Sequence, residues 1–201
     1  MNSADGTELG HIDLRSETVV SLAPEYAEAM GHCADRWLQP AAPEHAPSGH
    51  DVGDELAKLC GDWRVMRTVS VGHRGTAIDH LAIGPPGVFT MTTKLHPGAR
   101  AWIGDHAIKI NGQRTNYVRT SRLDAQRASR VLSRACGFAV PVRAAIVFVG
   151  LDDFTLAQPP ADVDVTTRRR MGVWLAGLPV ANSANHIEAI HAAARRSTIW
   201  R

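Results

Sequence analysis

The sequence predicts an α/β domain, in which a β-sheet packs against helices. Three successive segments, 64–71, 76–83 and 87–94, have the alternation and β-branched residues of strands. Residues 121–136 have the periodicity of an amphipathic helix, and residues 142–149 form a continuous apolar run that is typical of a buried strand. A three-stranded meander followed by a helix that returns the chain to the sheet indicates this fold class.

The N-terminal quarter of the chain is predicted to lie outside this domain. It holds a helical candidate at 24–38 and then the segment 40–47, whose proline, alanine and histidine residues are typical of a linker. Residues 51–59 have the pattern of a short amphipathic helix, with which the domain begins. At 201 residues and 44% hydrophobic content, the chain is long enough for one good core. We therefore expect an N-terminal arm at 1–50 and one domain at 51–201.

Shorter elements complete the predicted domain. The turn 84–87 joins the second and third strands, and Gly137 ends the long helix. Asn111-Gly112 is a strong turn signal. The remaining predicted elements are a hairpin between 101–103 and 107–110, a strand at 162–166, a helix at 169–176, and a last helix near Asn185, which has capping-box spacing to Glu188.

Composition and short motifs exclude several classes of protein. A formal net charge of +2 does not by itself indicate nucleic-acid binding. Cys33, Cys60 and Cys136 form no C-x-x-C pair, so neither a disulfide framework nor a cysteine zinc site is expected. The sequence has no apolar stretch of membrane-spanning length, no signal-peptide pattern, no G-x-S-x-G and no P-loop. We expect a cytoplasmic protein that does not enter membranes.

The second and third strands carry the residues that indicate chemistry. If the 84–87 turn is symmetric, Asp79 lies opposite Thr92 across the hairpin, where opposed side chains are about 4.5–5.5 Å apart at Cβ. Because side chains alternate along a strand, Lys94 shares the face of Asp79 and Thr92. Two carboxylates at the opposed positions would chelate one hard cation, with the lysine beyond them to hold phosphate. The second of these positions holds a threonine.

This arrangement suits Mg²⁺ and a phosphate group. Mg²⁺ prefers oxygen ligands, usually one or two carboxylates completed by substrate phosphate and water, and it activates the water that attacks phosphorus. A threonine hydroxyl can ligate Mg²⁺ but carries no charge, so Thr92 should lower the affinity of the site. The alternative without function is that Asp79 and Lys94 are ordinary surface residues of two strands.

A set of motifs runs through the domain in a fixed order. They are Ile78-Asp79-His80-Leu81, Gly84-Pro85-Pro86-Gly87-Val88-Phe89, Thr92-Thr93-Lys94, Gly98, Asn111-Gly112, Tyr117-Val118-Arg119, Pro141-Val142-Arg143-Ala144 and Ala194-Arg195-Arg196. In order and spacing they resemble the nuclease-related domain (NERD) family, in particular its short actinobacterial members. The resemblance implies the restriction-endonuclease-like fold of the PD-(D/E)xK superfamily, which is a mixed sheet flanked by helices, and it implies action on DNA.

The resemblance also implies roles for particular residues. Asp79 matches the family's metal-binding aspartate and Lys94 matches its lysine. Gln126 matches a glutamine on the following helix, where it would orient water or substrate. Asp54 or Glu55 matches an acid on the first helix.

Thr92 is the departure from the family pattern, because the family has aspartate or glutamate at this position. The substitution removes one of two central carboxylates and predicts a degenerate site. An acid from another element could replace it, and the candidates are Asp54, Glu55 and Asp105.

The long predicted helix carries a row of basic side chains. They are Arg119, Arg122, Arg127, Arg130 and Arg134, which share one arc of the helical wheel with Gln126. Arginines in a row suit the DNA backbone, because phosphate contacts release counterions and need no particular base. The alternative is a solvated helix face.

From these residues we expect a DNA-directed, nuclease-related protein whose ancestral reaction is Mg²⁺-dependent phosphodiester hydrolysis. The competing hypothesis is a non-catalytic module that keeps the fold to bind nucleic acid or protein. A third is a purely structural domain. The oligomeric state is left open.

Overall fold

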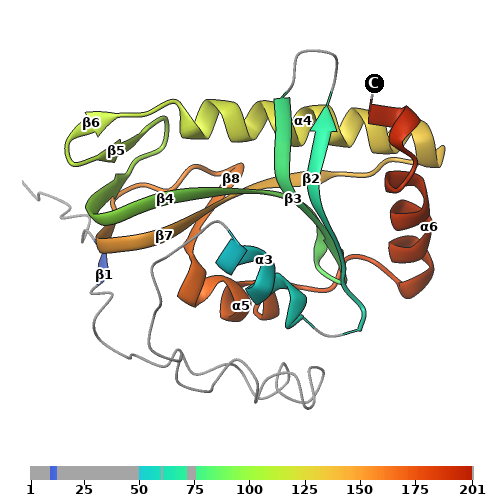
Figure 1. Cartoon of the computed structure of the whole chain (residues 1–201), viewed down its shortest axis with the longest axis horizontal. Helices are drawn as coiled ribbons and strands as arrows, with labels where there is room; N and C mark the ends of the chain where they lie inside the picture. Colours follow the sequence, from blue (N-terminus) through green and yellow to red (C-terminus); the bar gives the residue numbers. More distant parts are fainter. Residues whose placement is uncertain (1–9, 13–49, 60, 72–75, 201) are drawn as a thin grey trace, which may run out of the picture.

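The computed structural model describes residues 10–12, 50–59, 61–71 and 76–200. In this part of the chain one eight-stranded sheet has the central order β1-β7-β4-β3-β2 (Figure 1). The strands are β1 (Gly10–Ile12), β2 (Arg64–Val71), β3 (Thr76–Gly84), β4 (Gly87–Ile103), β5 (Ile108–Ile110), β6 (Gln113–Arg114), β7 (Val142–Leu156) and β8 (Val163–Thr167). The helices are α3 (His50–Ala57), α4 (Tyr117–Cys136), α5 (Arg168–Ala176), α6 (Ala184–Ala194) and the 3-10 helix η1 (Ser197–Trp200).

The sheet is mixed and has helices on both faces. β2, β3 and β4 form the antiparallel meander that the sequence predicts, whereas β4, β7 and β8 run parallel to one another. In Figure 1, α4 runs along one side of the sheet, and α3 and α5 lie together on the other side. The predicted α/β class is confirmed, and the architecture is consistent with the restriction-endonuclease-like fold.

Each face of the sheet has its own apolar core. On the side of α4 and α6, the buried side chains include Leu81, Ile83, Val88, Ala128, Leu132, Ile187 and Ile190. On the side of α3 and α5, they include Val52, Leu56, Phe89, Met91, Met171 and Leu175. Neighbouring residues of β3 and β4 therefore contribute to different cores, as the alternation of side chains along a strand requires.

Helix α4 forms because its sequence is amphipathic along its whole length. Its buried residues recur at spacings of three and four and are Val118, Ser121, Asp124, Ala125, Ala128 and Leu132. It begins at Tyr117, earlier than the predicted 121, and ends where predicted. Gly137 takes the left-handed conformation (φ 77°) and donates its backbone N–H to the carbonyl of Ser133 at 3.0 Å.

The β3–β4 hairpin has the predicted register near its turn, but the pairing ends before the predicted pair of Asp79 with Thr92. Gly84 lies opposite Gly87, and the pairing continues residue by residue to His80 opposite Met91. The tail of the chain holds the turn, because the carbonyl of Pro85 accepts hydrogen bonds from two backbone N–H groups just beyond α5, at residues 181 and 182, each at 2.8 Å. The predicted symmetric turn is therefore confirmed despite its two prolines.

Several elements differ from the prediction. β4 continues past Lys94 to Ile103, with register shifts against β7 between Leu95 and Arg100, and it pairs with β5 as predicted. β1 pairs with β7 and was not predicted. The predicted helix at 24–38 and linker at 40–47 lie outside the described residues.

The start of α6 corrects the predicted capping box. The N-cap is Ser183, whose Oγ accepts from the backbone N–H of His186 at 3.4 Å. Asn185 lies inside the helix, and Glu188 forms an ion pair with Arg64 instead of returning to the cap. In the part of the chain that the structure describes, no helix is long and apolar enough to cross a membrane.

Candidate functional site

The candidate site lies where β3 separates from β4. Regular pairing of the two strands ends at His80 and Met91, and Asp79 is the residue before His80. Asp79 is half-buried, and its Oδ2 accepts a hydrogen bond from the backbone N–H of Thr93 at 2.8 Å. The carboxylate therefore bonds to β4 where the regular ladder has ended, and it lies at the opening between the strands.

The sheet is also interrupted on the other side of Asp79. The pairing of β2 with β3 skips Thr68 and Asp79, and Thr68 has a positive φ of 50°. A β-branched residue rarely adopts this conformation, which costs on the order of 1–3 kcal/mol and persists where the surrounding structure enforces it. Asp79 is thus positioned by a local distortion of the sheet.

Thr92 and Lys94 lie beside this opening on β4. Both are half-buried, and they alternate with Phe89 and Met91, which pack on the side of α3. Thr92 and Lys94 therefore face α4. Lys94 Nζ is 4.8 Å from the ring centroid of Tyr117, the first residue of α4, in a cation–π contact. The aromatic ring fixes the position of the ammonium group.

His96 joins the same group of side chains. Its Nε2 lies 2.9 Å from the hydroxyl of Tyr117, and its ring is tilted against Phe148. Burial lowers the pKa of His96, and the positive charge of Lys94 lowers it further. The imidazole is therefore neutral at pH 7, and it can donate or accept one proton beside the lysine.

Asp124 is a buried acid of α4 that the sequence interpretation missed. It lies on the inner side of α4 and is only 6% exposed. Burial is the main cause that raises the pKa of Asp124; Arg127 and Lys94 lower this pKa, and Asp79 raises it. Lys94 and Asp79 are therefore electrostatic neighbours of this carboxylate. An acid within the apolar arc of an amphipathic helix was the signal that could have identified it.

A few buried polar atoms in the described part of the chain have no hydrogen-bond partner. Among the described residues, the four such side-chain atoms are His80 Nδ1, Thr93 Oγ1, Ser121 Oγ and Thr167 Oγ1. His80 and Thr93 alternate to the α3 side of the sheet, together with Ala82 and Met91, whereas Ser121 lies on the inner side of α4. Because an unpaired buried polar group costs free energy, each of these side chains lowers the stability of the fold unless another group pairs with it.

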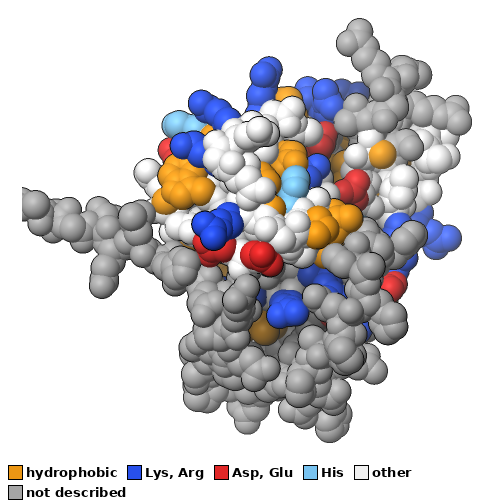
Figure 2. Space-filling model, turned by 60° about the vertical axis from the view of Figure 1, so that its left-hand side comes forward, with side chains coloured by type: hydrophobic (Ala, Val, Ile, Leu, Met, Phe, Trp, Pro, Cys, Tyr) orange, Lys and Arg blue, Asp and Glu red, His pale blue; other side chains and the backbone are white. Residues whose placement is uncertain are grey.

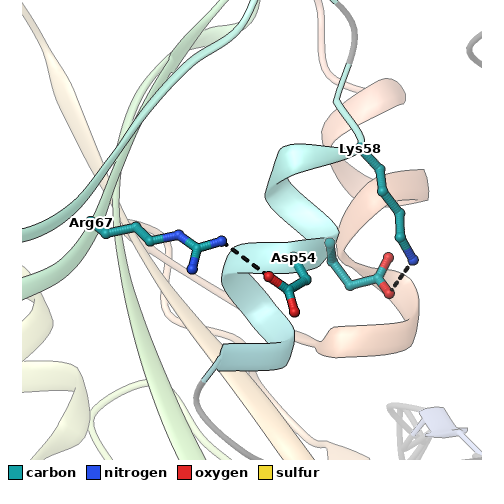
Figure 3. Close-up of polar contacts among 4 residues, drawn as sticks. Asp54, Lys58 and Arg67 are labelled. Carbon is teal, nitrogen blue, oxygen red and sulfur yellow. Dashed lines mark hydrogen bonds and ion pairs between the residues drawn. The ribbon is translucent and has the colours of Figure 1, made fainter.

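The other predicted acids are held elsewhere. Figure 3 shows Asp54 of α3 directed toward Arg67 of β2, with Asp54 Oδ1 3.1 Å from Arg67 Nη2. Glu55 forms an ion pair with Lys58 at 2.7 Å within the same helix. Helix α3 packs on one face of the sheet, and the side chains of Thr92 and Lys94 lie on the opposite face. Asp105 lies in the connection between β4 and β5.

The predicted arginine row divides into two groups. The exposed outer side of α4 carries Arg119, Gln126, Arg130 and Arg134. Arg122 instead binds Asp162, with Nη2 2.6 Å from Oδ1, and this bond raises the pKa of Arg122 and lowers that of Asp162. Arg127 turns toward Asp124, with Nη1 3.7 Å from Oδ1. In Figure 2, lysine and arginine side chains project along the upper margin of the molecule, at the height of α4.

Comparison with known families decides the relationship of the chain. The model of a family described as nuclease-related domain (NERD) matches residues 46–149, just over half of the 201 residues. The chain belongs to the nuclease-related domain family. No curated protein and no solved structure matches it. The β3–β4 hairpin and α4 fall inside the matched span, so the nuclease-related domain contains the whole candidate site.

The nuclease-related domain offers oxygen donors at this site. No group of three or more His, Cys, Asp or Glu side chains arranged to hold a metal occurs among the described residues. The carboxylate of Asp79 and the hydroxyl of Thr92 are hard donors of the type that Mg²⁺ takes, and Mg²⁺ usually completes its shell with water and substrate phosphate. These two oxygen donors therefore fit Mg²⁺, and the remaining ligands would be water and substrate phosphate.

Proposed function

We propose that this protein acts on DNA and hydrolyses phosphodiester bonds with Mg²⁺, at a site weakened by Thr92. The observation that supports this function most is the bond of the Asp79 carboxylate to the backbone N–H of Thr93, the residue before Lys94, where β3 separates from β4. The nuclease-related family of the chain supports the same reaction class. Membership of the family does not by itself specify a reaction. We propose phosphodiester hydrolysis because an acid can bind the metal ion, a lysine can bind phosphate, and both lie where the two strands separate.

The side chains of the opening would divide the work. Asp79 is the principal ligand of the proposed Mg²⁺, and Thr92 is a neutral ligand. Mg²⁺, when bound, supplies a Lewis acid that polarises the phosphate and acidifies water. Lys94, held by the ring of Tyr117, stabilises the negative charge that develops on the phosphate. Gln126 is exposed on the outer side of α4, so we assign it to contact with the substrate.

The outer side of α4 would bind the DNA backbone. Arg119, Arg130 and Arg134 are exposed there. Each arginine that meets a phosphate releases counterions, which gives binding that weakens as salt is added. Arg122 is bound to Asp162 and is expected to contribute less.

A non-catalytic nucleic-acid-binding module is the second candidate. The neutral hydroxyl of Thr92 favours it, because a site with one strand carboxylate holds a divalent cation weakly. This module would bind DNA through α4 without a requirement for Mg²⁺ and without cleavage.

Cleavage assays separate the two functions. Plasmid and single-stranded DNA are incubated with Mg²⁺ or Mn²⁺ and with the wild type, Asp79→Ala or Thr92→Glu. We expect slow cleavage by the wild type, none by Asp79→Ala and faster cleavage by Thr92→Glu, which restores the second acid to β4. No cleavage by any of the three would favour the binding module. Equal cleavage by all three would place the reaction elsewhere.

DNA affinity tests the role of α4 separately. The double variant Arg119→Ala/Arg130→Ala should weaken DNA binding and reduce the slope of log affinity against log salt by about 0.9 for each lost contact. Arg122→Ala is the matched control, because its guanidinium is bound to Asp162. Equal losses in both variants would contradict a specific role for the outer side of the helix.

A further inference from the structure

We propose that Asp124, on the inner side of α4, supplies the second carboxylate that Thr92 lacks, so that a divalent cation binds between the helix and the opening of the β3–β4 hairpin. This inference rests on the proposed function, because it concerns the same cation. It differs from the arrangement expected from the sequence, in which both acids belong to the hairpin. One ligand would instead come from the helix that covers it.

The buried carboxylate of Asp124 needs a positive charge nearby to offset the cost of its desolvation, and the fold provides only one that lies beyond hydrogen-bond distance. The residue is 6% exposed, and its nearest basic partner, Arg127, is 3.7 Å away from Oδ1, beyond hydrogen-bond distance. A buried carboxylate costs several kcal/mol unless it is paired and hydrogen-bonded. A cation beside Asp124 would provide the missing compensation.

The charges around Asp124 also fit a shared cation. Lys94 attracts this carboxylate, and Asp79 repels it, with the effect of raising the pKa of Asp124. Two carboxylates that repel each other are stabilised by a divalent cation that binds both of them. The ammonium of Lys94 lies against Tyr117, at the same edge of the helix.

Helix α4 presents a polar stripe at this place. Tyr117, Ser121 and Asp124 are spaced by four and three residues, so they follow one another along one side of the helix. Ser121 is 1% exposed, and its Oγ has no hydrogen-bond partner among the described residues. This orphaned hydroxyl, one turn before Asp124, is an independent indication that the inner side of α4 is prepared for a polar ligand.

A purely structural role for Asp124 makes different predictions. In that role the carboxylate anchors Arg127 along the helix, and removal of either partner should lower stability alike without any effect on cations. In the proposed role Arg127 competes with the cation for the carboxylate. Arg127→Ala should then leave the affinity for Mn²⁺ unchanged or raise it.

Titration with Mn²⁺, followed by the electron paramagnetic resonance signal of the free ion, tests the inference without measuring cleavage. Asp124→Asn should weaken Mn²⁺ binding by at least about tenfold, since even the loss of an outer-shell partner costs roughly 10–100-fold. Asp164→Asn is the matched control, because Asp164 is a half-buried acid of β8 that is bound to Arg143 at 2.7 Å. The double variant Thr92→Glu/Asp124→Asn should recover binding by returning the acid to the hairpin.

The outcomes separate this inference from the proposed function. If Asp79→Asn abolishes Mn²⁺ binding and a folded Asp124→Asn binds like the wild type, the inference is wrong and the proposed function stands. If the wild type binds no Mn²⁺, both fail. Circular dichroism checks folding, and Asp124→Ser replaces Asp124→Asn if the amide prevents folding; unchanged binding by that variant overturns the inference as well.

Discussion

The two halves of α4 perform different tasks with the same helical periodicity. The C-terminal half buries Ala128 and Leu132 against β3 and α6. The N-terminal half buries Val118 and Ala125 in an apolar cluster and, at equivalent spacings, also places Ser121 and Asp124 on its inner side. A sequence periodicity therefore shows which side of the helix is buried, but the chemistry of the buried residues decides whether that stretch is core or site.

The comparison also shows where stability resides. Apolar side chains that fill a core contribute free energy in proportion to the area they bury. Buried polar groups that lack partners lower stability, and proteins retain them mainly where function needs them. Ala128 and Leu132 in the C-terminal half should thus stabilise the fold, whereas the buried polar groups of Ser121 and Asp124 in the N-terminal half should lower its stability.

Leu132→Ala should produce the largest effect. Leu132 is fully buried, so its truncation should lower the free energy of unfolding by about 2–5 kcal/mol, measured by urea denaturation. Leu123→Ala on the same helix is the control; its side chain is 41% exposed and its loss should matter little. Similar losses for the two variants would show that α4 does not carry the core as described.

Serine-to-alanine substitutions should change the free energy of unfolding in opposite directions in the two halves of α4. Ser133 Oγ accepts from the backbone N–H of buried Val140 at 2.9 Å, so Ser133→Ala leaves this donor unpaired and should cost about 1–3 kcal/mol. Ser121→Ala removes a hydroxyl without a partner and should stabilise the protein by up to about 1 kcal/mol. The same urea measurement serves both. Destabilisation by both variants would mean that Ser121 is satisfied in solution.

A smaller effect is expected from pH at the N-terminal half. The folded pKa of His96 lies below its ordinary value of about 6.5, so the unfolded chain takes up a proton first as the pH falls through that value. The folded state should lose stability there, and the loss should continue down to the folded pKa. His96→Gln should lose less stability than the wild type between about pH 7.5 and about pH 5.5. An NMR titration that places the pKa of folded His96 at or above 6.5 would contradict this.

The sequence predicted the sheet better than it predicted the site. The hairpin from Gly84 to Gly87 and the helix that ends at Gly137 depend on local turn and capping chemistry, and local patterns reveal such chemistry directly. The continuation of β4 past Lys94 was missed because Pro97 and Gly98 are residue types that usually end a strand. There the register of β4 shifts against β7, so the strand accommodates both residues and continues.

Asp124 was missed for a different physical reason. It is separated in sequence from Asp79 and Lys94, and their charges act on it only because α4 folds back against the sheet. Strand register and helical wheels describe one element at a time. The partners of a side chain across two elements depend on packing, which no local pattern contains.

The turn at Pro85 has a consequence for the autonomy of the family segment. The carbonyl of Pro85 is bonded to the backbone at residues 181 and 182, and both cores are completed by α5 and α6. All of these partners lie beyond residue 149, where the match to the family ends. We therefore expect that the matched stretch would not fold stably alone, because the residues after 149 bond to the turn of its β3–β4 hairpin and complete the cores on both faces of its sheet.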